Sequence, residues 1–189
     1  MKITGRLIST MLSLSVPFIA LAGEPAPHVM TMSAVDQNSP LVKQVRNATA
    51  KFKDINAALA AGFAQATPCV SGPDFGAMGV HFVLGSRITA GTLNGSEPEA
   101  LIYEPLPNGA FRLVGVEFII LASIWQSQIP QGSTATPVLE GHLMNYVAFP
   151  NRYGLPAFYE LHVWAWEQNP VGSFADWNTQ VSCDQQATG

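Results

Sequence analysis

The chain has 189 residues, of which 48% are hydrophobic and only 12% are charged, and its net charge is −4. A composition this apolar is not that of a disordered protein, and the length suits one folded domain. With 9 basic against 13 acidic residues, the chain offers no basic surface for nucleic acid, so we expect no nucleic-acid partner.

The first residues have the pattern of a secretory signal peptide. Lys2 and Arg6 form a short basic region, an apolar run follows over residues 7–21, and Ala20-Leu21-Ala22 is a small-x-small cleavage pattern. This run is shorter than the roughly 20 apolar residues that a membrane-spanning helix needs. We therefore predict a signal peptide over residues 1–22, a periplasmic or extracellular location, and no membrane span after cleavage.

Residues 23–38 are rich in Pro, Ser, Met and Ala without periodicity, which predicts a flexible leader. Behind it we expect one domain over residues 39–189. Ser39 and Pro40 form a typical helix start, with Ser39 as the N-cap and Pro40 in the first turn. Apolar residues then recur at helical spacing, which predicts one long helix that ends near Gly62.

After this helix and a Pro/Gly-rich loop, the apolar pattern changes to a period of two, which is typical of strands. The predicted strands cover residues 80–84, 100–103, 111–122, 139–148 and 156–166. The Asn108-Gly109 step predicts a hairpin between the second and third of them. One helix followed by several strands predicts an α+β domain, in which an N-terminal helix precedes an antiparallel sheet or a small β-barrel.

Two cysteines, Cys69 and Cys183, occur in the whole chain. In an exported protein, a lone pair most simply forms one disulfide. The alternative is a pair of soft metal ligands, but neither CxxC spacing nor a neighbouring histidine supports it. We predict the disulfide.

The last predicted strand has one face of unusual composition. Because side chains alternate along a strand, this face carries Phe158, Glu160, His162, Trp164 and Trp166. A solvated sheet surface would carry Thr, Lys, Glu and Ser instead. Large rings around two ionisable groups indicate the inside of a pocket or barrel mouth.

Other ionisable residues also lie on apolar strands. Glu117 has apolar neighbours on both sides, and a buried carboxylate is costly unless it is paired, hydrogen-bonded or bound to a metal. Imidazoles and carboxylates on neighbouring strands are the ligand set of Zn, Fe or Cu. We predict a divalent transition metal on His81, Glu117 and His162, with His142 or Glu160 as the fourth ligand. The alternative reading is that each histidine is structural and that a distant Arg, Lys or Tyr satisfies Glu117.

These residues leave several functions open. If the site is catalytic, the metal activates water or oxygen and Glu160 is the acid or base. We expect Phe158, Trp164 and Trp166 to line the pocket that holds this metal site. A metal-free protein that holds a small apolar ligand, with the same His and Glu residues fixing its polar end, is the first alternative. A structural protein of the cell envelope is the second. The sequence leaves open whether the protein is an enzyme, which metal or substrate it takes, and its oligomeric state.

Several stretches resemble a family of secreted bacterial proteins that is usually described as uncharacterised. They are Met78-Gly79-Val80-His81-Phe82, residues 98–104, residues 113–118, Leu161-His162-Val163-Trp164, Asn169-Pro170, and residues 174–178 with the later Cys183. The resemblance implies an exported single-domain protein and brings no activity with it. At the level of the fold, His and Glu on strands also resemble the cupins, which bind a metal with such residues on a barrel, although the closely spaced His pair of the cupins is missing here.

Overall fold

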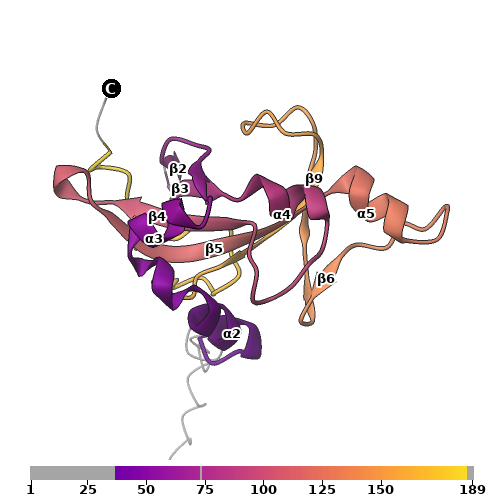
Figure 1. Ribbon diagram of the computed structural model, residues 1–189, viewed down its shortest axis with the longest axis horizontal. Coiled ribbons are helices and arrows are strands. Elements are labelled where there is room, and N and C mark those ends of the chain that lie inside the picture. Colours follow the sequence, from indigo (N-terminus) through magenta and orange to yellow (C-terminus); the bar gives the residue numbers. More distant parts are fainter. Residues whose placement is uncertain (1–36, 73, 187–189) are drawn as a thin grey trace, which may run out of the picture. The chain divides into compact units, whose positions relative to one another are not determined.

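The computed structural model describes residues 37–72 and 74–186 (Figure 1). The predicted signal peptide and nearly all of the predicted leader lie outside these residues. No helix in the described part of the chain is long and apolar enough to cross a membrane.

The helical segment after Ser39 is divided into three parts. They are α2 (Pro40–Thr49), the 3-10 helix η1 (Ala50–Lys53) and α3 (Ile55–Ala60). The Ser39 hydroxyl accepts a hydrogen bond from the backbone N–H of Val42 at 3.1 Å, as an N-cap does. The prediction of one continuous helix is wrong at Asp54, whose backbone is extended and whose carboxylate accepts the N–H of Asn56 at 2.9 Å. Because this side chain satisfies the backbone locally, it ends one helix and begins the next.

The strands form an antiparallel sheet in the order β1-β3-β4-β5-β9-β8, and β2 pairs with β3 beside this path. The bounds are β1 (Ala64–Gln65), β2 (Val70–Gly72), β3 (Gly76–Val83), β4 (Ala100–Pro105), β5 (Phe111–Leu121), β8 (Asn145–Val147) and β9 (Phe158–Val163). The predicted α+β class with an antiparallel sheet is confirmed at this level. The sheet is open and does not close into a barrel.

Two turns decide how the strands are divided. β4 and β5 form the predicted hairpin, in which Asn108 and Gly109 both have positive φ within the short helix η2 (Pro107–Gly109). The single strand predicted over residues 139–148 is wrong, because Glu140 and Gly141 also have positive φ and turn the chain there.

The remaining elements lie around this sheet. The turn at residues 140–141 joins a small separate hairpin of β6 (Val138–Leu139) and β7 (His142–Leu143). Helix α4 (Gly85–Ala90) follows β3, and helix α5 (Ala122–Gln128) follows β5. Neither of these short helices was predicted from the sequence, since the apolar runs around them have no clear helical period.

One face of the sheet, which we call the helix-covered face, packs against α2, η1 and α3 (Figure 1). It is formed by Val80, Phe82, Leu101, Tyr103, Val116, Phe118 and Leu161, and the helices add Leu41, Val42, Val45, Phe52 and Ala58. All of these side chains are buried, so this face provides the main apolar burial of the described residues.

The opposite face, which we call the site face, carries ionisable groups between two apolar clusters. Its central residues are His81, Ala100, Glu117, Glu160 and His162. One flanking cluster contains Ile88, Ala100, Ile119 and Phe158, and the other contains Ala77, Ile102, Val114, Trp164 and Val181. The two clusters exclude water from both ends of the polar group.

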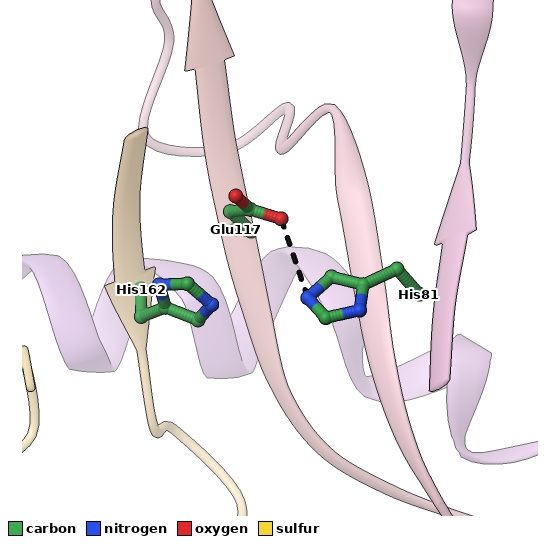
Figure 2. Close-up of side chains that lie close together, drawn as sticks. All are labelled: His81, Glu117 and His162. Atoms are coloured by element: carbon green, nitrogen blue, oxygen red, sulfur yellow. Dashed lines mark ion pairs between the residues drawn. The ribbon is translucent and has the colours of Figure 1, made fainter. Parts of the chain in front are cut away.

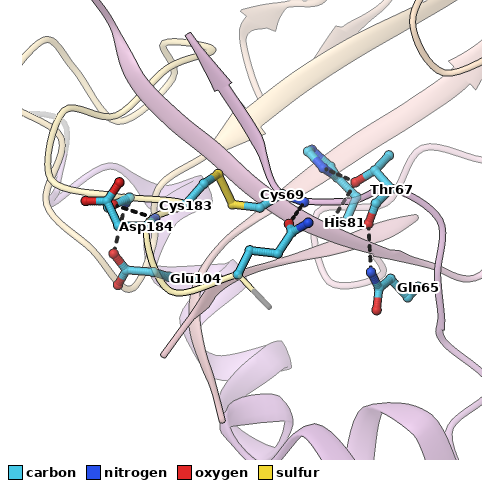
Figure 3. Close-up of a disulfide and its surroundings, with 9 residues drawn as sticks. Gln65, Thr67, Cys69, His81, Glu104, Cys183 and Asp184 are labelled. Atoms are coloured by element: carbon cyan, nitrogen blue, oxygen red, sulfur yellow. Dashed lines mark hydrogen bonds between the residues drawn. A yellow bond between two sulfur atoms is a disulfide. The ribbon is translucent and has the colours of Figure 1, made fainter. Parts of the chain in front are cut away.

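The predicted disulfide between Cys69 and Cys183 is present, with an S–S distance of 2.01 Å (Figure 3). It joins the segment after β1 to the C-terminal tail across 114 residues, and closing so long a loop stabilises a fold by about 4–5 kcal/mol in the chain-entropy description. The tail also pairs Asn178 with Ala77 at the start of β3. Gly76 permits this approach, because a Cβ there would lie 2.1 Å from the Asn178 carbonyl oxygen.

Candidate metal centre

Three strands bring His81, Glu117 and His162 together on the site face (Figure 2). Glu117 on β5 lies directly opposite His162 on β9, whereas His81 on β3 lies beyond β4. At the position on β4 that faces Glu117, the residue is Ala100. Since a single methyl group leaves the space above β4 open, His81 Nε2 and Glu117 Oε2 meet across this strand at 3.4 Å.

The three side chains are almost fully buried, with exposed fractions of 2%, 3% and 0%. His81 Nε2 and both ring nitrogens of His162 have no hydrogen-bond partner. Leaving a buried polar group unpaired costs about 1–3 kcal/mol. Several such atoms at one point therefore lower the stability of the fold, so stability does not explain why they are there.

The spacing of these atoms suits a metal ion. One ligand atom from each of His81, Glu117 and His162 lies within 4.8 Å of the others. In a tetrahedral zinc site with bonds of 2.0–2.2 Å, ligand atoms lie about 3.4 Å apart. The Nε2–Oε2 pair is already at 3.4 Å, so small side-chain movements would complete the set.

The other ring nitrogen of His81 is held by Thr67 (Figure 3). His81 Nδ1 lies 3.2 Å from the Thr67 hydroxyl, which also accepts the backbone N–H of His81 at 3.1 Å. Histidines that bind metals usually donate their second ring N–H to such an outer partner, which fixes the tautomer and the ring orientation. With Nδ1 as the donor, the lone pair of Nε2 faces Glu117.

A second group of potential ligands shares His162 with the first. It consists of Glu160, His162 and Asp176, whose ligand atoms also lie within 4.8 Å of one another. Asp176 comes from the C-terminal tail, and its Oδ1 lies 3.7 Å from His162 Nδ1 while it accepts a hydrogen bond from Asn145 at 3.0 Å. Glu160 Oε2 is buried and has no hydrogen-bond partner.

Burial opposes the charged form of every ionisable side chain in the cluster. Loss of solvation lowers the pKa of His81 to about 3, with a smaller contribution from His162, and lowers the pKa of His162 to about 4. Burial, followed by the adjacent Glu160, raises the pKa of Glu117 well above its usual range, and burial also raises the pKa of Glu160 and Asp176. Both imidazoles are therefore neutral near pH 7, and the neutral imidazole is the form that binds a cation.

A cavity of about 100 Å³ lies beside His81 and Glu117. Its other walls are Ala66, Thr67, Val83, Ile88, Ile119, Tyr153, Leu155 and Phe158. The walls are mostly apolar, and the volume suits a few water molecules or one very small ligand. The cavity gives one side of the cluster room for a further ligand.

The aromatic residues predicted to line the pocket have different positions. Phe158 does line the cavity. Trp164 is buried beside His162, with ring centroids 6.2 Å apart and planes at 18°. Trp166 packs on the helix-covered face, where its Nε1 donates to Thr49 at 3.0 Å. The alternation assumed from the sequence stops because β9 ends at Val163 and the chain turns there.

Among the predicted fourth ligands, Glu160 lies near the cluster and His142 does not belong to it. The Glu160 carboxyl group acts on that of Glu117 and raises its pKa. His142 lies on β7 and stacks on Phe174, with ring centroids 3.8 Å apart. Its strand belongs to the separate β6–β7 hairpin, so the predicted strand that would have carried it to the main sheet is absent.

Sequence reasoning missed Asp176 and Thr67 as parts of the site. Asp176 is the carboxylate within the aromatic stretch 174–178. A carboxylate among aromatic residues could have marked it as a candidate site residue. Thr67 lies in a loop, and no pattern in the sequence marked it as part of the site. Arg112, the cation nearest to Glu117 in sequence, pairs with Glu104 and Glu167 instead.

Comparisons with known proteins give no further information on this site. No protein-family model matches the chain, and neither the curated proteins nor the solved structures include a significant match. The resemblance to secreted bacterial proteins and the likeness to cupins therefore stay predictions from the sequence.

Proposed function

We propose that this protein binds a divalent transition metal ion through His81, Glu117 and His162. The observation that supports the proposal is the meeting of two neutral, buried imidazoles and one carboxyl group from three strands, with unpartnered nitrogens at their centre. Two nitrogens and one oxygen suit Zn, Fe or Cu. Three protein ligands leave at least one coordination position for water or substrate, and the adjacent cavity has room for it.

The chemistry that this arrangement supports best is metal-assisted activation of water or oxygen. The cavity admits only a small reactant, which argues against a bulky substrate at the metal itself. Glu160 is our candidate acid or base, because its carboxyl group contacts Glu117 and is only 5% exposed. Its role would be to give or take a proton at the ligand bound beside Glu117.

We further propose that the protein acts in the periplasm or outside the cell. The disulfide is compatible with an oxidising compartment, and the first residues have the composition of a signal peptide. Expression of the full chain in a bacterial host, followed by N-terminal sequencing of the exported product, tests this location. Export with cleavage after Ala22 is the expected result, and retention in the cytoplasm would contradict it.

Metal content tests the proposed site. The full chain is exported in an oxidising compartment, purified, stripped with a chelator, equilibrated with Zn²⁺ and analysed for bound metal. We expect stoichiometric zinc in the wild type and a lower zinc content in His81→Gln and His162→Gln. His142→Gln is the matched control, because His142 lies outside both ligand groups, and it should keep the metal. Equal zinc content in all four proteins, or none in the wild type, would refute the proposal.

The apolar cavity supports a second candidate, a metal-free protein that binds a small apolar ligand. Val83, Ile88 and Phe158 would then contact the ligand, while His81 and Glu117 would fix its polar end. Mass spectrometry of the protein as purified distinguishes the two candidates. A co-purified organic molecule with no metal favours the second, and a metal without such a molecule favours the first.

A further inference from the structure

We propose that the protein binds two cations, the second held by Glu160, Asp176 and the ring nitrogen of His162 that the first does not use. His162 would then bridge the two ions. The inference rests on the proposed function, since the first ion is the one assigned to His81, Glu117 and His162. While the second ion is bound, Glu160 is its ligand and does not act as the acid or base.

The two ring nitrogens of His162 face different ligand groups. In Figure 2, one nitrogen of His162 points toward His81 and the other points to the opposite side. On that side Nδ1 lies 3.7 Å from Asp176 Oδ1, and Glu160 belongs to the same group of mutually close ligand atoms. One imidazole therefore stands between two sets of donors, each of which includes carboxyl oxygen.

The second group contains atoms that no hydrogen bond satisfies. His162 Nδ1 and Glu160 Oε2 are both buried without a partner. Asp176 does not satisfy Nδ1 directly, because 3.7 Å exceeds the length of an N–H···O hydrogen bond. A cation between these atoms would bond to all of them at once, whereas an N–H group on Nδ1 would stay unpaired.

The charges of the two groups balance with two divalent ions. Glu117, Glu160 and Asp176 supply three negative charges when ionised. A bridging His162 gives up its remaining ring proton to solvent and supplies the fourth, so two divalent cations leave the cluster neutral. Arg152, which is exposed, also acts on Glu160 electrostatically, but a single arginine does not balance three carboxylates.

The second group also provides a route from solvent. The Asp176 side chain is 35% exposed, whereas those of Glu117 and His162 are at most 4% exposed. The ion held by Asp176 would therefore be the one nearer to solvent and the easier to exchange. This difference predicts two classes of bound metal with unequal release rates.

Cation stoichiometry tests the proposal directly. The full chain, stripped of metal, is titrated with Zn²⁺ and counted by native mass spectrometry. We expect two ions per chain in the wild type and one in Asp176→Asn and in Glu160→Gln. Both variants keep the shape of the side chain, and Asn at position 176 can still accept the hydrogen bond from Asn145. Asp74→Asn, at an exposed acid elsewhere, is the control and should keep two ions.

Copper provides a readout of the bridge itself. Two Cu²⁺ ions joined by one imidazole are magnetically coupled, so the wild type loaded with two coppers should give less paramagnetic resonance signal per copper than Asp176→Asn. One ion in the wild type, unchanged by either substitution, would overturn the second site and leave the proposed function intact. Two ions in Asp176→Asn and Glu160→Gln would also overturn it, and no ion in the wild type would refute both proposals.

Discussion

The two faces of the sheet use the same strands for opposite purposes. On the helix-covered face, residues such as Val116, Phe118 and Leu161 are buried among other apolar side chains. On the site face, the residues next to them in the chain are Glu117 and His162, which are also buried, and both ring nitrogens of His162 lack a hydrogen-bond partner. A fold tolerates groups that cost stability when other parts of it supply a surplus, and such groups concentrate where proteins function. The comparison supports our proposal that the site face binds a ligand, while the helix-covered face maintains the fold.

The largest effect is expected on the helix-covered face. Phe118→Ala removes a fully buried ring from the centre of β5 and should lower the free energy of unfolding by about 3–5 kcal/mol. Urea denaturation measures this loss. Because the Phe118 side chain points away from the cluster, the variant should still bind zinc at a temperature where it is folded. Loss of zinc from folded Phe118→Ala would show that the two faces are not independent.

A smaller effect of opposite sign is expected on the site face. Glu117→Gln removes a buried carboxyl group that resists ionisation, so the metal-free variant should be at least as stable as the wild type. Zinc at about 100 times its Kd for the site on His81, Glu117 and His162 should add about 2.7 kcal/mol to the stability of the wild type, and the variant should lack this contribution. Denaturation with and without zinc measures both quantities.

Glu104→Gln is the matched control for that experiment. Glu104 is also buried, but it pairs with Arg112 outside the ligand groups. We expect this control to lose stability and to keep its response to zinc. A Glu117→Gln protein that is clearly less stable without metal would mean that Glu117 serves the fold.

A further prediction extends the comparison to the dependence of stability on pH. Glu99 is 1% exposed and accepts the backbone N–H of Ile119 at 3.0 Å, and burial raises its pKa from 4.5 to about 7. Between these values the folded protein keeps a proton that the unfolded chain loses, so this group's contribution to stability is present below pH 4.5 and is lost as pH rises through 7. The slope is at most about 1.4 kcal/mol per pH unit.

Glu99→Gln isolates this contribution, because the amide oxygen can still accept from Ile119 while the side chain no longer titrates. The stability of the variant relative to the wild type should rise between pH 4.5 and 7 and then level off. Taking this difference removes the opposing effect of His81 and His162, whose pKa values are lowered by burial. A difference that is independent of pH would contradict the assignment.

The sequence predicted the features that a few neighbouring residues determine, and it did not predict the contacts between distant segments. Alternation along β3, β5 and β9 was enough to single out His81, Glu117 and His162, and the Asn108-Gly109 step was enough for the hairpin. Spatial convergence was not predictable, because it depends on Ala100 in a strand that carries no ligand.

The errors have local physical causes as well. An apolar period that looks continuous over residues 40–62 hides the capping carboxylate of Asp54. The face predicted for Trp166 is wrong because the strand ends at Val163, and nothing in the composition marks that end. Asp176 lies at the cluster because of the course of the C-terminal tail. The tail has no helical or strand period, so its course was not predictable from the sequence.

The disulfide connects the outer supports of both histidines. Thr67, which holds His81, lies two residues before Cys69, and Asp176, which faces His162, lies seven residues before Cys183. Breaking this one covalent bond would remove a constraint that the two supporting segments share, while backbone hydrogen bonds such as those between Ala77 and Asn178 would remain. If the chain is exported as we propose, this shared constraint forms only once the chain has reached the oxidising compartment.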